Sequence, residues 1–210
     1  MKFAPSKGFL NRSKEPLASN ARHSGGLEQF CTLLQTGQDL SILDMSGASQ
    51  ANVSFVTNYG HRISSDDALG TMQQCFGDDF LANQQAASNA HRFLEQTLTF
   101  PDESFDGVLA WDVLQFLTPP LLDNTVAKLL RVMRPGALML GFFNADEKAT
   151  QIPVYNYRVQ DSRTLMQIPR SGYQRCQYFN NRMLEKLFAK ASSLKFFLTR
   201  GSQREVIVRR

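Results

Sequence analysis

The residues with the clearest potential for chemistry lie in SILDMSGASQAN, residues 41–52. An apolar run there ends in an acid, Asp44, which is followed by small residues and then by polar residues that can begin a helix. This order is typical of a strand that leads into a nucleotide-binding loop, because small side chains let a ligand approach the main chain. The loop has only one glycine, Gly47, so two interpretations stay open: a modified ligand loop, or a loop that has lost its ligand.

Two further places put polar residues at the ends of apolar runs. Asp66 and Asp67 follow HRISS. Trp111 is the last residue of FDGVLAW, and Asp112 comes directly after it. In an open parallel sheet, ligands bind beyond the carboxyl ends of the strands, so these residues are expected to lie near Asp44. Each also has a structural interpretation, because Asp is a common helix N-cap and a Trp can belong to the core.

Apolar spacing predicts strands that alternate with helices. Strands are expected at SILDM, HRISSDD, FDGVLAW and ALMLGFF, and helices at GGLEQFCTLLQ, QANVSFVTN, ALGTMQQCF, DFLANQQAASNAHRFL, LLDNTVAKLLRVM and NNRMLEKLFAKA. This alternation indicates βαβ units and a mostly parallel sheet, which makes the chain an α/β protein. LKFFLTR and REVIVRR have only a short turn between them and are expected to pair as an antiparallel hairpin.

The chain divides into three parts by pattern. Residues 1–22 are polar and interrupted by prolines, which predicts a flexible N-terminal arm. Residues 23–210 carry the periodic segments and are long enough for one domain. Within that domain, an insertion at about 145–179 has no clear period, and a connection of such length is a candidate lid or substrate-binding segment.

Composition excludes several classes. No run of about 18 apolar residues occurs, so no membrane-spanning helix or membrane partner is expected. The three cysteines, Cys31, Cys75 and Cys176, are far apart, which favours reduced thiols and a cytoplasmic location. The histidines lack metal-ligand spacing, so no metal is expected. Neither a P-loop nor a nucleophile elbow is present.

The net charge of +4 hides a segregation along the chain. Residues 1–22 sum to +4, residues 23–157 to −9, and residues 158–210 to +9. A basic C-terminal quarter can face a nucleic acid, so that partner stays open. The favoured interpretation is that it neutralises the acidic middle of the same molecule.

Two longer stretches carry a family resemblance. LTFPDESFDGVLAWDVLQFL, residues 98–117, and LLRVMRPGALMLGFF, residues 129–143, resemble the fourth strand, the following helix and the fifth strand of class I S-adenosylmethionine-dependent methyltransferases. The resemblance extends from about Leu27 to Arg210. It implies a single-domain Rossmann-like three-layer sandwich with a mostly parallel seven-stranded sheet and a C-terminal antiparallel hairpin. It also implies S-adenosylmethionine as the cofactor.

The first family motif is an acid followed by spaced glycines. Aligned from Asp44, the glycine positions hold Ser46, Ala48 and Gln50, with Gly47 between them. Small residues can preserve a close approach of the ligand, which makes Asp44, Ser46, Gly47 and Ala48 the candidate cofactor loop.

The resemblance assigns further cofactor contacts. Asp66 or Asp67 would hold the ribose hydroxyls, since a carboxylate offers two acceptor oxygens. The acid that reads adenine in the family falls on Leu94 here, so a main-chain carbonyl or the adjacent Glu95 or Gln96 would take its place.

At the end of the fourth strand, Trp111 and Asp112 resemble the residues that flank the cofactor. All of these assignments require an open hollow at the edge of the sheet, which side chains such as Gln50 or Trp111 would close.

The resulting hypothesis is an S-adenosylmethionine-dependent methyltransferase with an unidentified small-molecule acceptor. The alternative is a non-catalytic binding or regulatory protein on the same scaffold, with a nucleic-acid protein as a third and weaker option. No catalytic residue can be assigned. Five insertion residues are candidates for an acceptor pocket or a surface hairpin: Tyr155, Tyr157, Arg158, Arg170 and Tyr173.

Overall fold

The computed structural model describes residues 21–197, 199 and 201–210. Six strands form the main sheet in the spatial order β3 (Arg62–Ser65), β2 (Ser41–Asp44), β4 (Phe105–Trp111), β5 (Met133–Asn144), β9 (Gln203–Arg209) and β8 (Ser193–Phe197). The first four strands are parallel, whereas β9 is antiparallel to both of its neighbours. The C-terminal hairpin predicted from the sequence is therefore confirmed.

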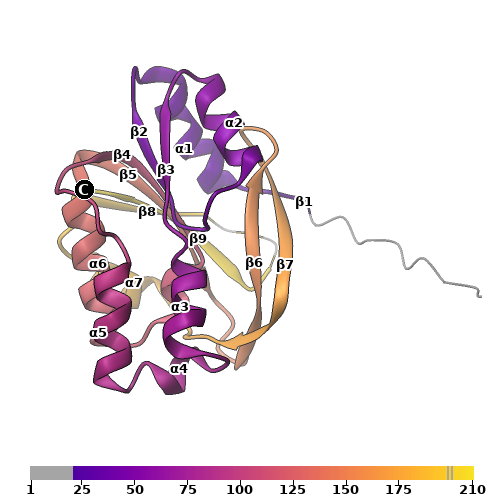
Figure 1. Cartoon of the computed structure of the whole chain (residues 1–210). Coiled ribbons are helices and arrows are strands. Elements are labelled where there is room, and N and C mark those ends of the chain that lie inside the picture. Colours follow the sequence, from indigo (N-terminus) through magenta and orange to yellow (C-terminus); the bar gives the residue numbers. More distant parts are fainter. Residues whose placement is uncertain (1–20, 198, 200) are drawn as a thin grey trace, which may run out of the picture.

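In the described part of the chain, seven α-helices connect and cover these strands (Figure 1). They are α1 (Gly25–Thr36), α2 (Gln50–Asn58), α3 (Ala68–Phe76), α4 (Phe80–Asn83), α5 (Ala87–Gln96), α6 (Leu121–Val132) and α7 (Asn181–Leu187). Helix α1 is capped at both ends: the Ser24 hydroxyl accepts a hydrogen bond from the amide of Leu27, and Gly37 is the C-cap.

Strand side chains point alternately into two apolar cores. Leu43, Val108 and Met139 pack with α3, α5, α6 and α7, whereas Ile42 and Leu109 pack with α1 and α2. Successive residues of a strand face opposite sides of the sheet, so two buried faces require a helical layer on each side. The predicted α/β three-layer class is confirmed.

A second, three-stranded sheet has the order β1 (Ala21–His23), β7 (Thr164–Arg175) and β6 (Gln151–Val159). The β6–β7 hairpin lies within the insertion predicted at about 145–179, and it contacts α2 through β6 and α4 through β7. Figure 1 shows it beside the end of the main sheet. Residues 1–20 of the predicted arm lie outside the described part of the chain, and Ala21 and Arg22 belong to β1.

The main sheet differs from the expectation in strand number. Among the described residues it has six strands rather than the seven that the family resemblance implies. The segment between α3 and β4 forms two helices, α4 and α5, instead of a strand. Asp79 caps α4, and the ASNAHRFLEQ sequence of α5 lacks the β-branched residues that favour a strand.

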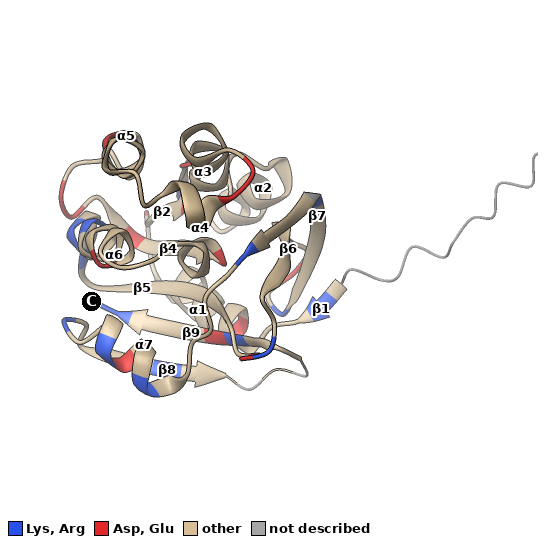
Figure 2. Ribbon diagram, turned by 90° about the horizontal axis from the view of Figure 1, so that it is seen from below, with Lys and Arg blue, Asp and Glu red and all other residues tan. Residues whose placement is uncertain are grey.

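Ion pairs connect the basic C-terminal quarter with the acidic middle of the chain. Arg163, Arg170, Arg175 and Arg210 lie within 2.5 to 3.4 Å of Glu28, Asp67, Asp79 and Glu103, respectively. Figure 2 shows basic and acidic segments interspersed over the ribbon. These contacts support the interpretation that the two charged regions compensate each other within one molecule.

Three further structural features are the helix lengths, the possible metal ligands and the cysteines. None of the helices in the described part of the chain has the length and apolar character needed to cross a bilayer. Within the same residues, no group of three His, Cys, Asp or Glu side chains is arranged to hold a metal ion. Cys31, Cys75 and Cys176 are free thiols, as the sequence predicts.

Replacing Gly107 by Ala tests the packing of β4 against α1. A Cβ at Gly107 would lie 2.8 Å from Cζ of Phe30 and 2.9 Å from Cδ1 of Ile42. Overpacking of this kind destabilises a core by about 1–3 kcal/mol, which urea denaturation can measure. Gly201→Ala is the control, because its Cβ would meet nothing within 4 Å. Equal stability of the two variants would contradict this packing.

Candidate functional site

A buried carboxylate lies at the carboxyl end of β2. Oδ1 of Asp44 accepts hydrogen bonds from the amide of Ser46 at 3.0 Å, the Ser46 hydroxyl at 2.8 Å and Nε1 of Trp111 at 2.7 Å. Oδ2 accepts from Nδ2 of Asn52 at 2.6 Å. Burial raises the pKa of Asp44 and these bonds oppose the rise. The carboxylate is therefore satisfied entirely by protein groups.

Asn52 connects this carboxylate to the β6–β7 hairpin. Besides its bond to Asp44, its Nδ2 donates to the carbonyl of Tyr157 at 3.0 Å, and its Oδ1 accepts from the amide of Val159 at 2.8 Å. Asn52 is completely buried on α2. One side chain thus fixes the end of β2, helix α2 and strand β6 relative to one another.

Two stacked aromatic rings cover the same end of the sheet. The rings of Trp111 and Tyr157 lie 5.1 Å apart and are nearly parallel, with an interplanar angle of 5°. Both side chains are buried, and Trp111 has a positive φ of 51°, which is uncommon for a bulky residue. The hydrogen bond to Asp44 and the stack hold Trp111 in this conformation.

The glycine-poor loop lies directly on the turn that follows β3. Ser46 forms a bridge with Asp67, and the amide of Gly47 donates to the carbonyl of Asp66 at 3.3 Å. Gly47 has a positive φ of 84°, so it occupies the one loop position that requires glycine. A Cβ there would lie 3.3 Å from Cβ of Asp67, so the two segments are in contact. Ala48 follows in the same loop.

The two acids after β3 have different environments. Asp67 is exposed, caps α3 through the amide of Gly70 and pairs with Arg170 of β7 at 3.4 Å. Asp66 is half-buried, and its Oδ2 accepts from the amide of Leu98 at 2.7 Å. Burial raises the pKa of Asp66, against the effect of that bond. Asp67 thus has the capping role that the sequence left open, and Asp66 is the better remaining candidate for a ligand.

Glu95 and Gln96 lie apart from the other candidates, at the end of α5. Glu95 is exposed and contacts His91 at 3.2 Å, while Oε1 of Gln96 accepts from the Cys75 thiol at 3.8 Å. Glu95 therefore contacts its own helix, α5, and Gln96 contacts α3, so the contacts of both lie away from Asp44.

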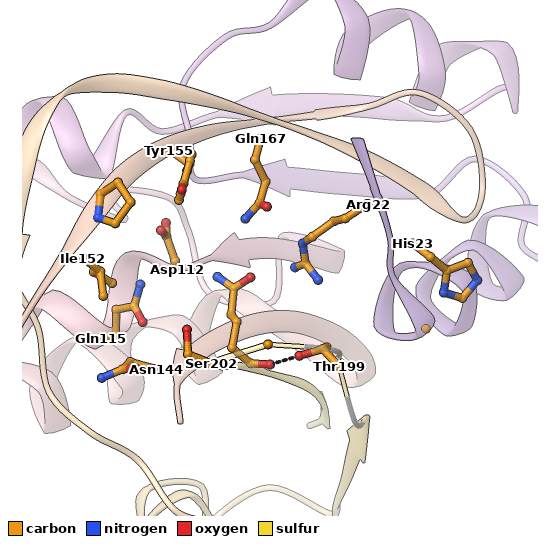
Figure 3. A pocket seen from close by; sticks show the side chains of 14 residues that line it. Arg22, His23, Asp112, Gln115, Asn144, Ile152, Tyr155, Gln167, Thr199 and Ser202 are labelled. Atoms are coloured by element: carbon orange, nitrogen blue, oxygen red, sulfur yellow. Dashed lines mark hydrogen bonds between the residues drawn. The ribbon is translucent and has the colours of Figure 1, made fainter. Parts of the chain in front are cut away.

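A cavity of about 740 Å³ lies beyond the carboxyl ends of β4 and β5 (Figure 3). Its wall includes Asp112, Gln115, Asn144, Arg22 from β1 and Tyr155 from β6. Of the ten residues predicted to bind a cofactor, only Asp112 reaches this cavity. The other nine gather around Asp44 or lie on α5.

The cavity wall contains buried polar atoms that have no hydrogen-bond partner among the described residues. They are Nε and Nη2 of Arg22, Oδ1 of Asp112, and both amide atoms of Gln115. Most buried polar groups in proteins are paired, so unpaired ones at a cavity indicate a place for a ligand or ordered water. This concentration makes the cavity the candidate functional site.

Asp112 is the acid at the centre of this site. Its Oδ2 accepts a hydrogen bond from the Tyr157 hydroxyl at 3.1 Å, and that hydroxyl accepts from Nε2 of Gln203 at 3.0 Å. Burial raises the pKa of Asp112 to about 7, although the bond from Tyr157 and the charges of Arg170 and Arg22 lower it. The side chain therefore exchanges a proton near neutral pH.

Sequence reasoning missed three residues of this region. Asn52 carries a usable signal, since it lies one helical turn before Val56 and thus on the apolar face of α2. Arg22 falls in the predicted arm, and Gln115 lies in a short 3₁₀ turn (Val113–Phe116), where no periodicity marks it. Only the tertiary structure brings Arg22 and Gln115 to one cavity.

Comparison with known families now identifies the scaffold. Residues 43–141 match the model of the methyltransferase domain family. That segment runs from β2 to β5 and includes Asp44, the loop after it, and Trp111 and Asp112. The match covers just under half of the chain and is consistent with the class I methyltransferase family that the sequence resembles. A search of curated proteins finds no match.

One solved structure supports the same fold at low sequence identity, and two others are similar to a lesser degree. The crystal structure of SpnF, described as a [4+2]-cyclase, has 11% identity and a TM-score of 0.50, covering 87% of this chain and 80% of that chain. A methyltransferase from Methanosarcina mazei has 13% identity, a TM-score of 0.49 and coverages of 86% and 96%. The Burkholderia thailandensis 1,6-didemethyltoxoflavin-N1-methyltransferase, solved with bound 1,6-didemethyltoxoflavin and S-adenosylhomocysteine, has 13% identity, a TM-score of 0.47 and coverages of 89% and 78%.

The cofactor position that the family resemblance implies is filled by protein side chains. It lies at the ends of β2, β3 and β4, where the Trp111 and Tyr157 rings stack above Asp44 and the loop rests on Asp66. Gln50 is exposed and bonded to Ser54, so it does not contribute. As these residues are arranged, they do not fit a nucleoside beside Asp44, and the open volume lies at β4 and β5 instead.

Replacing Asn52 by Ala is expected to destabilise the protein strongly. The change leaves Asp44 Oδ2, the Tyr157 carbonyl and the Val159 amide without their common partner. Buried groups left unpaired in this way predict a loss of about 2–4 kcal/mol in urea denaturation. Asn58→Ala, an exposed position on the same helix, is the control. A similar loss in both variants would contradict the role given to Asn52.

Replacing Asp112 by Asn is expected to change how stability depends on pH. The pKa of Asp112 is about 7, against 3.8 for an ordinary aspartate. Between these values the folded chain keeps a proton that the unfolded chain releases, so wild-type stability falls as pH rises and levels off above about 7. The variant lacks this loss, so its stability relative to wild type should rise by at most roughly 4 kcal/mol from pH 4 to 7.

Urea denaturation of both proteins across this pH range measures the difference. Asp102→Asn, at an exposed side chain, is the control and should show no such trend. A difference between wild type and Asp112→Asn that does not vary with pH would contradict the buried, protonated state of Asp112.

Proposed function

We propose that this protein is an S-adenosylmethionine-dependent methyltransferase whose acceptor is a small polar molecule in the 740 Å³ cavity. The observation that carries the proposal is the position of Asp112. It belongs to the motif that resembles the family's cofactor site, and it also lines the cavity with an unpaired oxygen. A cytoplasmic location is part of the proposal, in keeping with three free thiols.

Asp112 has the chemistry of a proton acceptor for the nucleophile. The Tyr157 hydroxyl orients its Oδ2, which leaves Oδ1 for an N–H or O–H group of the acceptor. A pKa near the working pH suits general-base catalysis. The cofactor of this family supplies the methyl group, and Asp112 would remove the proton that the acceptor must lose.

Cofactor binding at the family position would require the β6–β7 hairpin to act as a lid and release the Trp111–Tyr157 stack. Two buried hydroxyls support cofactor binding at this position, since Oγ of Ser49 and Oγ1 of Thr97 have no partner among the described residues. Ser49 follows the candidate loop, and Thr97 is next to Leu98, whose amide binds Asp66. Asp66 is the proposed ribose acceptor.

The second candidate function is a non-catalytic binding protein on the methyltransferase scaffold. The filled position above Asp44 favours it, because Trp111, Tyr157 and Asn52 replace a ligand with protein contacts. SpnF, a protein of this fold, is described as a [4+2]-cyclase, which illustrates that fold alone does not fix activity. A nucleic-acid partner has weaker support, because many C-terminal arginines pair with acids of the same chain.

Calorimetry with S-adenosylmethionine and S-adenosylhomocysteine tests the proposal. We expect micromolar binding that Asp66→Ala weakens more than tenfold, because a hydrogen-bonded charge is lost from the ribose. Asp67→Ala should weaken binding less, since Asp67 already caps α3. Asp102→Ala, at an exposed position, is the control.

Absence of heat at millimolar cofactor would contradict the enzymatic proposal and favour the binding protein. The nucleic-acid alternative predicts retention of RNA or DNA at low salt that weakens steeply as salt is added. Lack of retention at low salt would exclude that alternative.

A further inference from the structure

We propose that the free edge of Arg22 is a carboxylate-binding site, so that the ligand of the cavity is a small molecule with a carboxylate group. This inference rests on the proposed function for the cavity as the place of the ligand, and it specifies the ligand's class. Arg22 lies in the N-terminal strand β1, outside the segment that matches the methyltransferase family model.

The guanidinium of Arg22 is held in a fixed position from one side. Its Nη1 donates to Oε1 of Glu205 at 2.6 Å, and Glu205 is completely buried on β9. Oε2 of Glu205 accepts from the Ser24 hydroxyl at 2.9 Å and from the amide of Gly26 at 2.7 Å. The guanidinium carbon also lies 4.7 Å from the ring centre of Phe142. These contacts orient the group without using its other nitrogens.

The remaining two nitrogens form the edge that suits a carboxylate. Nε and Nη2 lie side by side on a guanidinium and donate parallel hydrogen bonds to the two oxygens of a planar anion. In Arg22 both atoms are buried, and neither has a partner among the described residues. Figure 3 shows the Arg22 guanidinium turned toward the interior of the cavity. A rigid and unpaired fork of donors at a cavity wall is a prepared anion site.

Other groups of the wall narrow the class of ligand. Gln115 is only 1% exposed, and its amide offers an unpaired donor and an unpaired acceptor. Asp112 adds an unpaired Oδ1. With the buried acids Glu205 and Asp112 nearby, a singly charged planar carboxylate is favoured over a doubly charged phosphate. The ligand therefore combines a carboxylate for Arg22 with an amide or amine for Gln115 and Asp112.

A carboxylate can reach Arg22 from two sources. One is the methyl acceptor itself, and the other is the methionine portion of the cofactor. Benzoate and its uncharged counterpart benzamide probe the site directly. S-adenosylhomocysteine and 5′-methylthioadenosine, which lacks the carboxylate, probe the cofactor.

Ligand-observed NMR for the benzoate pair and calorimetry for the nucleosides, on the full chain, test the inference. Arg22→Lys keeps the charge but loses the fork, so the affinity for the carboxylate-bearing probe should fall at least about tenfold, while the affinity for benzamide or 5′-methylthioadenosine should not change. A second variant, Arg22→Gln, removes the positive charge but leaves Glu205 unpaired. If this variant does not fold, the double variant Arg22→Gln/Glu205→Gln replaces both charges together. Arg163→Lys, an exposed arginine paired with Glu28, is the matched control.

Each result decides the inference. Arg22-dependent loss of benzoate binding supports it with the acceptor as source, and Arg22-dependent loss of S-adenosylhomocysteine binding supports it with the cofactor as source. Unchanged binding of benzoate and S-adenosylhomocysteine in Arg22→Lys and in the double variant overturns the inference. It is also overturned if the wild-type protein binds benzoate no better than benzamide and S-adenosylhomocysteine no better than 5′-methylthioadenosine. If the wild type binds no S-adenosylhomocysteine but binds benzoate through Arg22, the methyltransferase proposal fails and the carboxylate site stands.

Discussion

The buried carboxylate of Asp44 organises the end of the main sheet. A carboxylate removed from water must be matched by donors, because an unpaired buried charge is strongly destabilising. Its donors come from three elements: Ser46 in the loop after β2, Asn52 on α2 and Trp111 at the end of β4. Asn52 extends the same network to the β6–β7 hairpin. The positions of the loop, the helix and the hairpin therefore all depend on one acid.

This network explains why the open volume lies where it does. The rings of Trp111 and Tyr157 fill the region above Asp44, so the cavity begins at the next residue of the chain, Asp112, and extends over β4 and β5. The hairpin contributes to both regions, since Tyr157 stacks on Trp111 while its hydroxyl binds Asp112. Any motion that opened the region above Asp44 would therefore also change the hydrogen bonding of Asp112.

A second buried acid organises the other side of the cavity. Glu205 on β9 binds Arg22, Ser24 and Gly26, and so attaches the N-terminal strand and the start of α1 to the sheet. The protein thus places one buried carboxylate on each side of its candidate site. Asp44 holds protein groups over the family's cofactor position, whereas Glu205 presents a cation with a free edge to the cavity.

The sequence by itself determined the α/β class, the C-terminal hairpin and the position of helix α1, because these follow from local periodicity and turns. It also located Asp44, Asp66, Trp111 and Asp112 at strand ends. It did not determine the number of strands in the main sheet. The expected seventh strand was implied by the family resemblance and not by a segment rich in β-branched residues. Only the tertiary structure decided which polar groups were already paired and which faced a cavity. Those pairings join residues far apart in the chain, such as Arg22 with Glu205, and burial sets their strength, so no local pattern encodes them.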